Sequence, residues 1–184
     1  ARQHPEAAVV VAGCLAQRDA ERITRLPGVK LILGTQRRSE AVPLLERALN
    51  ENRLISAVGG LSGVPFEYLA VDRHEGHTRA VMKIQEGCDR YCAYCIIPSV
   101  RGPVRSMPLS DITAEADRLA SAGYRELVLT GIHLASYGRD LGATLLDAIF
   151  AVHAIQGALR IRLGSLEPLI ANERFVAALA DMSK

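Results

Sequence analysis

The stretch Gly87-Cys88-Asp89-Arg90-Tyr91-Cys92-Ala93-Tyr94-Cys95 places three thiols in a C-x3-C-x2-C frame. It contains three of the four cysteines in the 184-residue chain. Such crowding in a loop indicates a bound metal more than packing, because buried structural cysteines have no reason to gather in sequence. The odd number of thiols also argues against a self-contained disulfide, which would leave one thiol over.

Two kinds of metal centre fit this frame. A structural zinc site is almost always four-coordinate and closed, so zinc would need a fourth ligand from His74, His77 or a distant residue. Both histidines otherwise suit a solvated loop. A cubane iron–sulfur cluster suits a compact run of thiolates better, and with three thiolates it keeps one iron open for a ligand that is not protein. The spacing favours iron–sulfur and leaves zinc as the alternative.

The three-thiol frame and its flanks closely resemble the radical S-adenosylmethionine (SAM) methylthiotransferases. The residues that carry the resemblance are Lys83-Ile84-Gln85-Glu86-Gly87-Cys88, Tyr94-Cys95-Ile96-Ile97-Pro98 and Arg101-Gly102-Pro103-Val104-Arg105-Ser106. The resemblance implies that Cys88, Cys92 and Cys95 hold a [4Fe–4S] cluster whose open iron is chelated by SAM. Tyr94 occupies the aromatic position of the family's motif.

Composition narrows the class of protein. An apolar share of 49% predicts at least one packed core. No apolar run reaches the length of a membrane span, no signal peptide is evident, and clustered reduced cysteines then indicate the cytoplasm. The net charge of +2 neither demands nor excludes RNA. Because the chain begins at Ala1 without a methionine and stops within a helical pattern, we expect it to be a fragment.

The first part of the chain alternates buried-strand runs with helical patterns. We expect strands at 8–12 and 29–33 and helices at 17–25 and 38–50. The second helix should bury the face formed by Val42, Leu45, Ala48 and Leu49. Short joints between such elements imply parallel pairing. We therefore expect residues 1–58 to be the end of a small parallel α/β domain, followed by a linker at 59–78 where periodicity fades.

The second part, residues 79–184, repeats the strand–helix pattern. We expect strands at 80–85, 126–130 and 159–163, and helices that begin near Ser110, Thr144 and Asn172. The three strands lead into polar or glycine-bearing loops at 88–95, 131–137 and 165–167. Loops at the carboxyl ends of parallel strands build the active sites of α/β folds. The resemblance implies the first half of a (β/α)6-type partial barrel, so the predicted fold class is α/β.

The resemblance extends to individual loop residues. Gly131 lies where the family's backbone approaches the amino group of SAM, although a simple turn is the alternative. Ser165 and Glu167 stand near where SAM's ribose or amino acid end is held, but Glu167 could equally be a helix-start residue. Arg101 and Arg105 could offset the charge of a thiolate cluster or meet an anionic substrate. Solvated surface arginines are the alternative.

Cys14 is a separate case. Taken alone it would be a buried or inert thiol. The segment Val11-Ala12-Gly13-Cys14-Leu15-Ala16-Gln17, however, resembles the third cysteine motif of the methylthiotransferase N-terminal domain. That resemblance implies a second, auxiliary [4Fe–4S] cluster that supplies sulfur, whose other two cysteines would precede Ala1.

The resemblance implies an enzyme that adds a methylthio group to an adenosine next to the tRNA anticodon, with an electron donor such as a flavodoxin or ferredoxin. The segments 131–138 and 74–80 look like the branch that acts on N6-threonylcarbamoyladenosine. The other branches act on isopentenyladenosine in tRNA or on an aspartate of a ribosomal protein. The rival of another class is a non-catalytic metal-binding module, which predicts zinc and no need for Gly131, Ser165 or Glu167.

Overall fold

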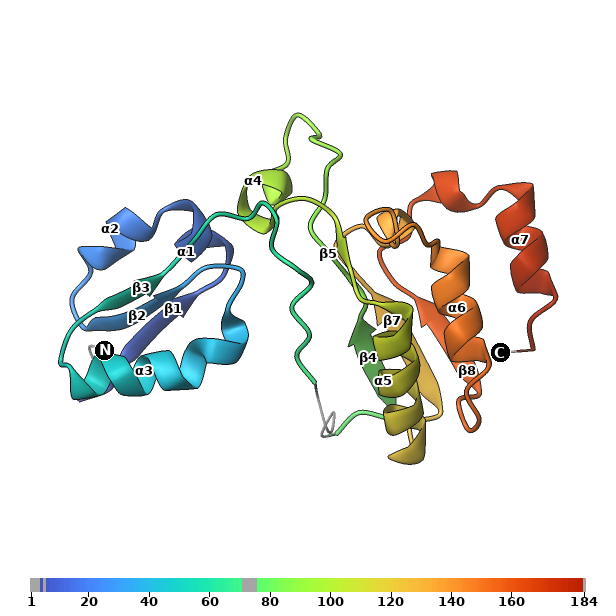
Figure 1. Ribbon diagram of the computed structural model, residues 1–184, viewed down its shortest axis with the longest axis horizontal. Helices are drawn as coiled ribbons and strands as arrows, with labels where there is room; N and C mark the ends of the chain where they lie inside the picture. The colour runs from blue at the N-terminus through green and yellow to red at the C-terminus, as the bar shows by residue number, and fades with distance from the viewer. Residues whose placement is uncertain (1–3, 5, 71–75, 184) are drawn as a thin grey trace. The chain divides into compact units, whose positions relative to one another are not determined.

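The computed structural model describes residues 4, 6–70 and 76–183 (Figure 1). The chain divides into two compact units, the N-terminal unit (Ala1–Leu69 with Arg90–Gly102) and the C-terminal unit (Ala70–Asp89 with Pro103–Lys184). Each is built from helices and a parallel sheet, so the predicted α/β class is confirmed. In the parts of the chain that the structure describes, no helix is long and apolar enough to cross a membrane.

The N-terminal unit has a three-stranded parallel sheet in the order β1-β2-β3. Its strands are β1 (Val9–Ala12), β2 (Val29–Leu33) and β3 (Ile55–Ala57). Its helices are α1 (Cys14–Arg18), α2 (Ala20–Thr24), the 3-10 turn η1 (Arg38–Glu40), α3 (Ala41–Asn50) and α4 (Ile97–Arg101). Leu33 pairs with both Ala12 and Ala57, so the three strands end level with one another.

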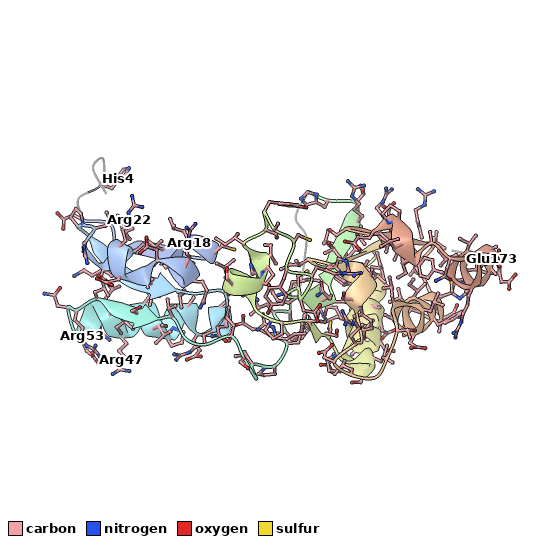
Figure 2. All side chains as sticks on the ribbon, turned by 90° about the horizontal axis from the view of Figure 1, so that it is seen from above. His4, Arg18, Arg22, Arg47, Arg53 and Glu173 are labelled. Atoms are coloured by element: carbon pink, nitrogen blue, oxygen red, sulfur yellow. The ribbon has the colours of Figure 1, made fainter. Side chains whose placement is uncertain are left out.

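Both faces of this sheet are covered, as a buried parallel sheet requires. One core joins α1 and α2 to the sheet and consists of Ala16, Ile23, Val29 and Ile32. The other joins α3 to the sheet and consists of Leu31, Leu33, Ala48, Ile55 and Ala57. Figure 2 shows the labelled arginines of these helices and of the turn after α3 pointing outward from the unit, namely Arg18, Arg22, Arg47 and Arg53.

Three expectations for this unit need correction. The helix expected at 17–25 is two short helices, because the side chain of Asp19 accepts a hydrogen bond from the Arg22 amide (3.3 Å) and starts α2. The buried face of α3 includes Leu45 and Ala48 as predicted, but Val42 and Leu49 are exposed. Strand β3 was not predicted, because three residues before a glycine pair give too short a pattern.

The observed buried face of α3 is a single helical stripe that begins at Ala41. With Ala41 as its first residue, the i, i+3, i+4, i+7 stripe is Ala41, Leu44, Leu45 and Ala48. Ala48 is fully buried, and the other three pack against the same core. The helix was expected to start at 38, three residues before Ala41, and the sequence pattern did not show which stripe faces the core.

The C-terminal unit contains a second parallel sheet in the order β4-β7-β8. Its strands are β4 (Arg79–Lys83), β7 (Glu126–Thr130) and β8 (Arg160–Leu163). Helices α5 (Leu109–Ser121) and α6 (Leu145–His153) pack beside one another on it (Figure 1). The remaining elements are β5 (Gln85–Glu86), β6 (Arg105–Ser106), η2 (Leu134–Ser136), η3 (Pro168–Ile170) and α7 (Glu173–Ala180).

The strand expected at 80–85 is divided at Ile84, because the chain changes hydrogen-bonding partner there. The Ile84 amide donates to the carbonyl of Thr130 (2.9 Å), which continues the pairing of β4 with β7. The Ile84 carbonyl instead accepts from the Met107 amide (2.8 Å), and β5 then pairs antiparallel with β6. The chain therefore leaves the parallel sheet four residues before Cys88.

The helix starts in this unit were predicted with mixed success. Thr144 and Asn172 cap α6 and α7 as expected, and Thr144 forms a capping box with Asp147. Ser110 is not the cap of α5, which begins after Pro108; its hydroxyl lies 3.3 Å from the Asp111 carboxylate instead. The strand expected at 126–130 is observed over the same residues.

Candidate functional site

The strands of the parallel sheet in the C-terminal unit end level with one another and lead into the predicted loops. Lys83 pairs with Thr130, and Leu129 pairs with Leu163. From these ends the chain enters the cysteine segment, the loop at 131–138 and the loop at 164–167. The carboxyl edge of a parallel sheet is where α/β folds place their ligands. This edge is therefore the candidate site.

The division of the chain into two units runs through the cysteine frame. Cys88 belongs to the C-terminal unit and is buried, with Gly87 before it in the left-handed region (φ 73°). Cys92 and Cys95 belong to the N-terminal unit, where the Cys95 amide donates to the Cys92 carbonyl (2.9 Å) in a tight turn. The side chain of Tyr94 is almost fully exposed.

All four cysteines are free thiols, and the donors in the 88–95 loop have the chemistry that an iron–sulfur cluster uses. Within the described residues, no three His, Cys, Asp or Glu side chains are gathered so as to hold a metal ion. His74 lies outside the described residues, and His77 is exposed. The residue types fit a cluster, and the ligand set stays a prediction.

Gln85 joins the start of the cysteine loop to the loop that follows β7. Its side chain is fully buried. The amide nitrogen donates to the carbonyls of Glu86 (2.9 Å) and Gly87 (2.7 Å), and the amide oxygen accepts from the backbone N–H of His133 (2.8 Å). Because these three hydrogen bonds are buried, the Gln85 side chain fixes the backbone at 86–87 against the backbone at His133.

Gly131 is required where the backbone passes Gln85. A Cβ at position 131 would lie 2.7 Å from both Cβ and Oε1 of Gln85 and 3.1 Å from its carbonyl oxygen. The glycine therefore has a reason within the protein itself, which is the close approach of two strand ends. The predicted contact of Gly131 with SAM stays a prediction.

His133, Ser136 and Glu167 lie together at this edge. Nδ1 of His133 is 2.6 Å from the hydroxyl of Ser136, and Nε2 is 2.9 Å from Oε2 of Glu167. Nε2 is fully buried and is not aligned for a hydrogen bond with that oxygen, so the second contact is one of proximity. The His133 side chain is 7% exposed and that of Glu167 is 41% exposed. Glu167 thus links a buried ring to solvent.

Ser165 is the other predicted residue of the loop after β8. It is exposed, and its backbone lies in the left-handed region (φ 54°), which is uncommon for a residue other than glycine. Such a conformation costs free energy and is often found at ligand sites, although it does not identify a ligand.

The loop after β7 is held by three hydrogen bonds to the segment 106–107. The hydroxyl of Tyr137 donates to the carbonyl of Met107 (2.7 Å), and the hydroxyl of Ser106 donates to Asp140 (2.6 Å) while accepting from the Gly138 amide (2.8 Å). Burial raises the pKa of Tyr137 to about 12, and the charge of Asp140 adds to this. Tyr137 therefore stays a neutral donor at any physiological pH.

The two predicted arginines have different environments. Arg105 is buried, so the alternative that it is a solvated surface residue is wrong. In the N-terminal unit, Nε of Arg101 donates to the sulfur of Cys14 (3.2 Å), which is the first residue of α1 and directly follows Gly13 (φ 104°). The contact of Arg101 with Cys14 was not evident in the sequence, because the two residues are 87 positions apart.

Further side chains fasten the 90–102 segment within the N-terminal unit. The hydroxyl of Thr35, at the end of β2, donates to the carbonyl of Val100 (2.6 Å). Gln17 accepts from the Thr35 amide (3.1 Å) and donates to the carbonyl of Gly59 (2.9 Å). Thus the carboxyl ends of β2 and β3 meet α1 and the segment that carries Cys92 and Cys95.

The C-terminal unit also has a pocket of about 260 Å³ beside the loop after β7. Its floor includes the buried side chains of Leu145 and Phe175, and Arg139 and Arg174 contribute its charged groups. None of the residues predicted for the cluster or for SAM lines it.

Comparison with known proteins identifies the class of this fold and site. Residues 82–183 match the model of the radical SAM superfamily, and the chain belongs to that superfamily. The superfamily implies a [4Fe–4S] cluster and SAM as cofactors.

Two curated relatives are similar over 90% of the chain. The threonylcarbamoyladenosine tRNA methylthiotransferase MtaB of Bacillus subtilis is 37% identical over 171 residues, which are 38% of that protein. The enzyme of the same name from Aquifex aeolicus is 36% identical over 167 residues, which are 40% of it. The chain thus spans about two fifths of the length of these relatives. The suspected resemblance to the family and to this branch is confirmed.

Proposed function

We propose that this chain is part of a radical SAM methylthiotransferase that modifies C2 of N6-threonylcarbamoyladenosine in tRNA. The observation that carries the proposal is the similarity over nine tenths of the chain to two enzymes named for that modification. The arrangement of the C-terminal unit supports the proposal. The cysteine segment and two other polar loops all follow strands of one parallel sheet, at its carboxyl edge. For such an enzyme we expect a cytoplasmic location, tRNA as the substrate and a flavodoxin or ferredoxin as the electron donor.

Cys88, Cys92 and Cys95 would hold the cluster, with Tyr94 at the aromatic position. When bound, the cluster and SAM supply an electron and the radical that removes hydrogen from an unactivated carbon, which side-chain acid–base chemistry cannot easily do. Cys88 directly follows Gly87, whose carbonyl accepts a hydrogen bond from the side chain of Gln85. The protein's own contribution is thus to fix where the cysteine loop begins.

Gly131, Ser165 and Glu167 are the residues we assign to SAM. They belong to loops that follow neighbouring parallel strands, β7 and β8. Gly131 keeps the backbone after β7 close to Gln85, and Glu167 presents a half-exposed carboxylate. The role proposed for these residues is to bind and orient SAM, and no proton transfer is assigned to them.

Cys14 is proposed as a ligand of an auxiliary cluster. The donor set visible in this chain is a single thiol with Arg101 beside it, so the remaining ligands would come from other residues of the complete protein. The domain limits predicted at 1–58, 59–78 and 79–184 belong to the same proposal.

The first experiment separates the enzyme from a zinc-binding module. The complete protein is reconstituted anaerobically, and its iron, sulfide and zinc are measured in wild type and in Cys92→Ala. Wild type should bind about four irons at the 88–95 loop, beyond any at the auxiliary site, and the variant should lose them. Stoichiometric zinc without iron uptake would contradict the proposal.

The second experiment tests the substrate. A strain that lacks the gene is complemented with the complete gene, and its tRNA nucleosides are analysed by mass spectrometry. The methylthio derivative of threonylcarbamoyladenosine should return. If only the methylthio-isopentenyl nucleoside returns, the branch is wrong, while the radical chemistry still stands.

A further inference from the structure

We infer that His133 is a positioning residue that holds the carboxylate of Glu167 where it accepts hydrogen bonds from the donor groups of bound SAM. The inference rests on the proposed function and goes beyond it, because the proposed function gives this histidine no role.

The position of the His133 ring is fixed from two sides. Its backbone N–H is held by the buried amide of Gln85 (2.8 Å), and its Nδ1 lies 2.6 Å from the hydroxyl of Ser136, three residues on. Ser136 is also buried, and its amide donates to the His133 carbonyl (2.9 Å). The ring therefore has little freedom to turn.

This anchoring sets the tautomer and the direction of the other ring nitrogen. If the Ser136 hydroxyl donates to Nδ1, the proton of the neutral ring is on Nε2, which lies 2.9 Å from Oε2 of Glu167. The N–H is not aligned with that oxygen in this structure. Catalytic and binding contacts often become aligned only when the ligand is present.

Glu167 is suited to bridge this ring and a ligand. Its side chain is 41% exposed, whereas that of His133 is 7% exposed. A carboxylate can accept several hydrogen bonds at once, so a contact with His133 is compatible with contacts to a ligand. The loop that carries it enters η3 directly after Glu167, and Ser165 is in a left-handed conformation two residues earlier. The backbone around the carboxylate is thus tightly specified.

Charge identifies SAM, and not the tRNA substituent, as the ligand. SAM carries a sulfonium and ribose hydroxyls, which a carboxylate stabilises, whereas its own carboxylate and amino group would be taken up by the open iron. The threonylcarbamoyl substituent carries a carboxylate of its own, which Glu167 would repel. Moreover, Gln85 holds both His133 and the carbonyl of Gly87, the residue before the first cysteine of the cluster loop. Glu167 is therefore linked, through His133 and Gln85, to the residue that precedes the first cysteine of the cluster loop.

Two substitutions of His133 separate positioning from packing. In His133→Gln, the side-chain amide can place a donor near the position of Nε2, whereas in His133→Asn the shorter amide can replace only Nδ1. The complete holoenzyme is used, and SAM affinity is measured by equilibrium dialysis with the cluster oxidised, so that no turnover is needed. We expect about tenfold weaker SAM binding for His133→Asn, as for loss of one charge-assisted contact, and less than about threefold weakening for His133→Gln.

Glu167→Gln provides an independent arm that does not depend on the stability of a buried substitution. It is isosteric and half-exposed, and it should also weaken SAM binding about tenfold. The double variant His133→Asn/Glu167→Gln should be no weaker than the single ones, because the two residues act as one unit. His153→Asn, at the end of α6 in the same unit, is the control and should bind SAM like wild type.

Equal SAM affinity for His133→Asn and His133→Gln overturns the inference, since the ring would then serve packing alone. Unchanged SAM affinity with a raised KM for tRNA overturns it too, and would assign the pair to the substrate. If the wild-type holoenzyme holds its iron but binds no SAM, the proposed function itself fails. The control for that last outcome is the iron content measured on the same samples.

Discussion

The two ends of the β4-β7-β8 sheet both carry charged side chains, but they use them differently. At the amino ends, Glu126 lies 2.7 Å from Arg162, 3.8 Å from Arg160 and 3.9 Å from Arg79. The arginines there are at least half exposed. At the carboxyl ends, the buried side chain of Gln85 contacts backbone groups, and the buried ring of His133 contacts the hydroxyl of Ser136.

The difference shows that the number of charges at an edge says little about its role. Exposed ion pairs are screened by water and contribute little to stability. Buried polar groups must be matched, so they specify one arrangement of the chain and are costly to disturb. The carboxyl edge is therefore the one whose geometry is determined, as a ligand site requires.

The largest expected effect is at Gly131. In Gly131→Ala the new Cβ would lie 2.7 Å from Gln85 Cβ and Oε1, with the Gln85 carbonyl oxygen at 3.1 Å. Because Gln85 is fully buried and bonded on both sides, it cannot move aside cheaply. We expect a loss of about 1–3 kcal/mol in the free energy of unfolding, measured by urea denaturation.

Gly60→Ala is the matched control, since a Cβ at that position meets nothing within 4 Å. It should leave stability close to that of wild type. A Gly131→Ala variant as stable as Gly60→Ala would show that the carboxyl edge is not tightly packed, and the contrast between the two edges would fail.

A smaller effect is expected for Tyr137→Phe. The substitution removes the donor to the Met107 carbonyl and leaves that acceptor without this partner. The expected cost is about 1–2 kcal/mol in the free energy of unfolding at pH 8. Thermal or urea unfolding of the two proteins measures it.

This cost should shrink in alkali. Burial and Asp140 raise the pKa of Tyr137 to about 12 from an ordinary value of 10.0. A raised folded-state pKa gives stability that is complete below pH 10 and is lost as the pH rises toward 12, by at most about 1.4 kcal/mol per pH unit. The phenylalanine variant lacks this titration, so a wild-type advantage that is constant from pH 8 to 11 would contradict the interpretation.

Much of this organisation could be predicted from the sequence, because it depends on local patterns. The strand at 126–130 and the caps Thr144 and Asn172 were correct, since periodicity and capping act over a few residues. The cysteine frame was recognised through a resemblance that the superfamily match confirmed. The face of α3 was predicted only in part, because the sequence does not show which neighbours of Leu45 and Ala48 pack against the sheet.

The contacts within the candidate site could not be predicted in the same way. Gln85 and His133 are 48 residues apart, and Arg101 and Cys14 are 87 apart. Each pair meets only because parallel strands end level with one another or because a distant segment packs on a unit. Gln85 lay within the recognised stretch and Gly131 had been selected, but only the structure shows that the glycine is needed because the glutamine is there.

The smallest effect is expected at the amino edge, and it is the sharpest test of the comparison. The hydrogen bond from Arg162 lowers the pKa of Glu126, against a smaller effect of burial, and Arg160 and Arg79 add to the lowering. A depressed pKa gives stability that is present above the usual range of a glutamate and is lost as the pH falls through the folded-state value. Glu126→Gln should therefore lower the thermal midpoint at pH 7 by less than Tyr137→Phe does. In acid, the difference in thermal midpoint between wild type and Glu126→Gln should disappear.

The SAM affinity of the complete protein should not change in Glu126→Gln, because the ion pairs lie at the edge opposite the ligand loops. A loss of SAM binding comparable to that of Glu167→Gln would show that the two ends of the sheet are coupled, and the division between a structural edge and a functional edge would have to be abandoned.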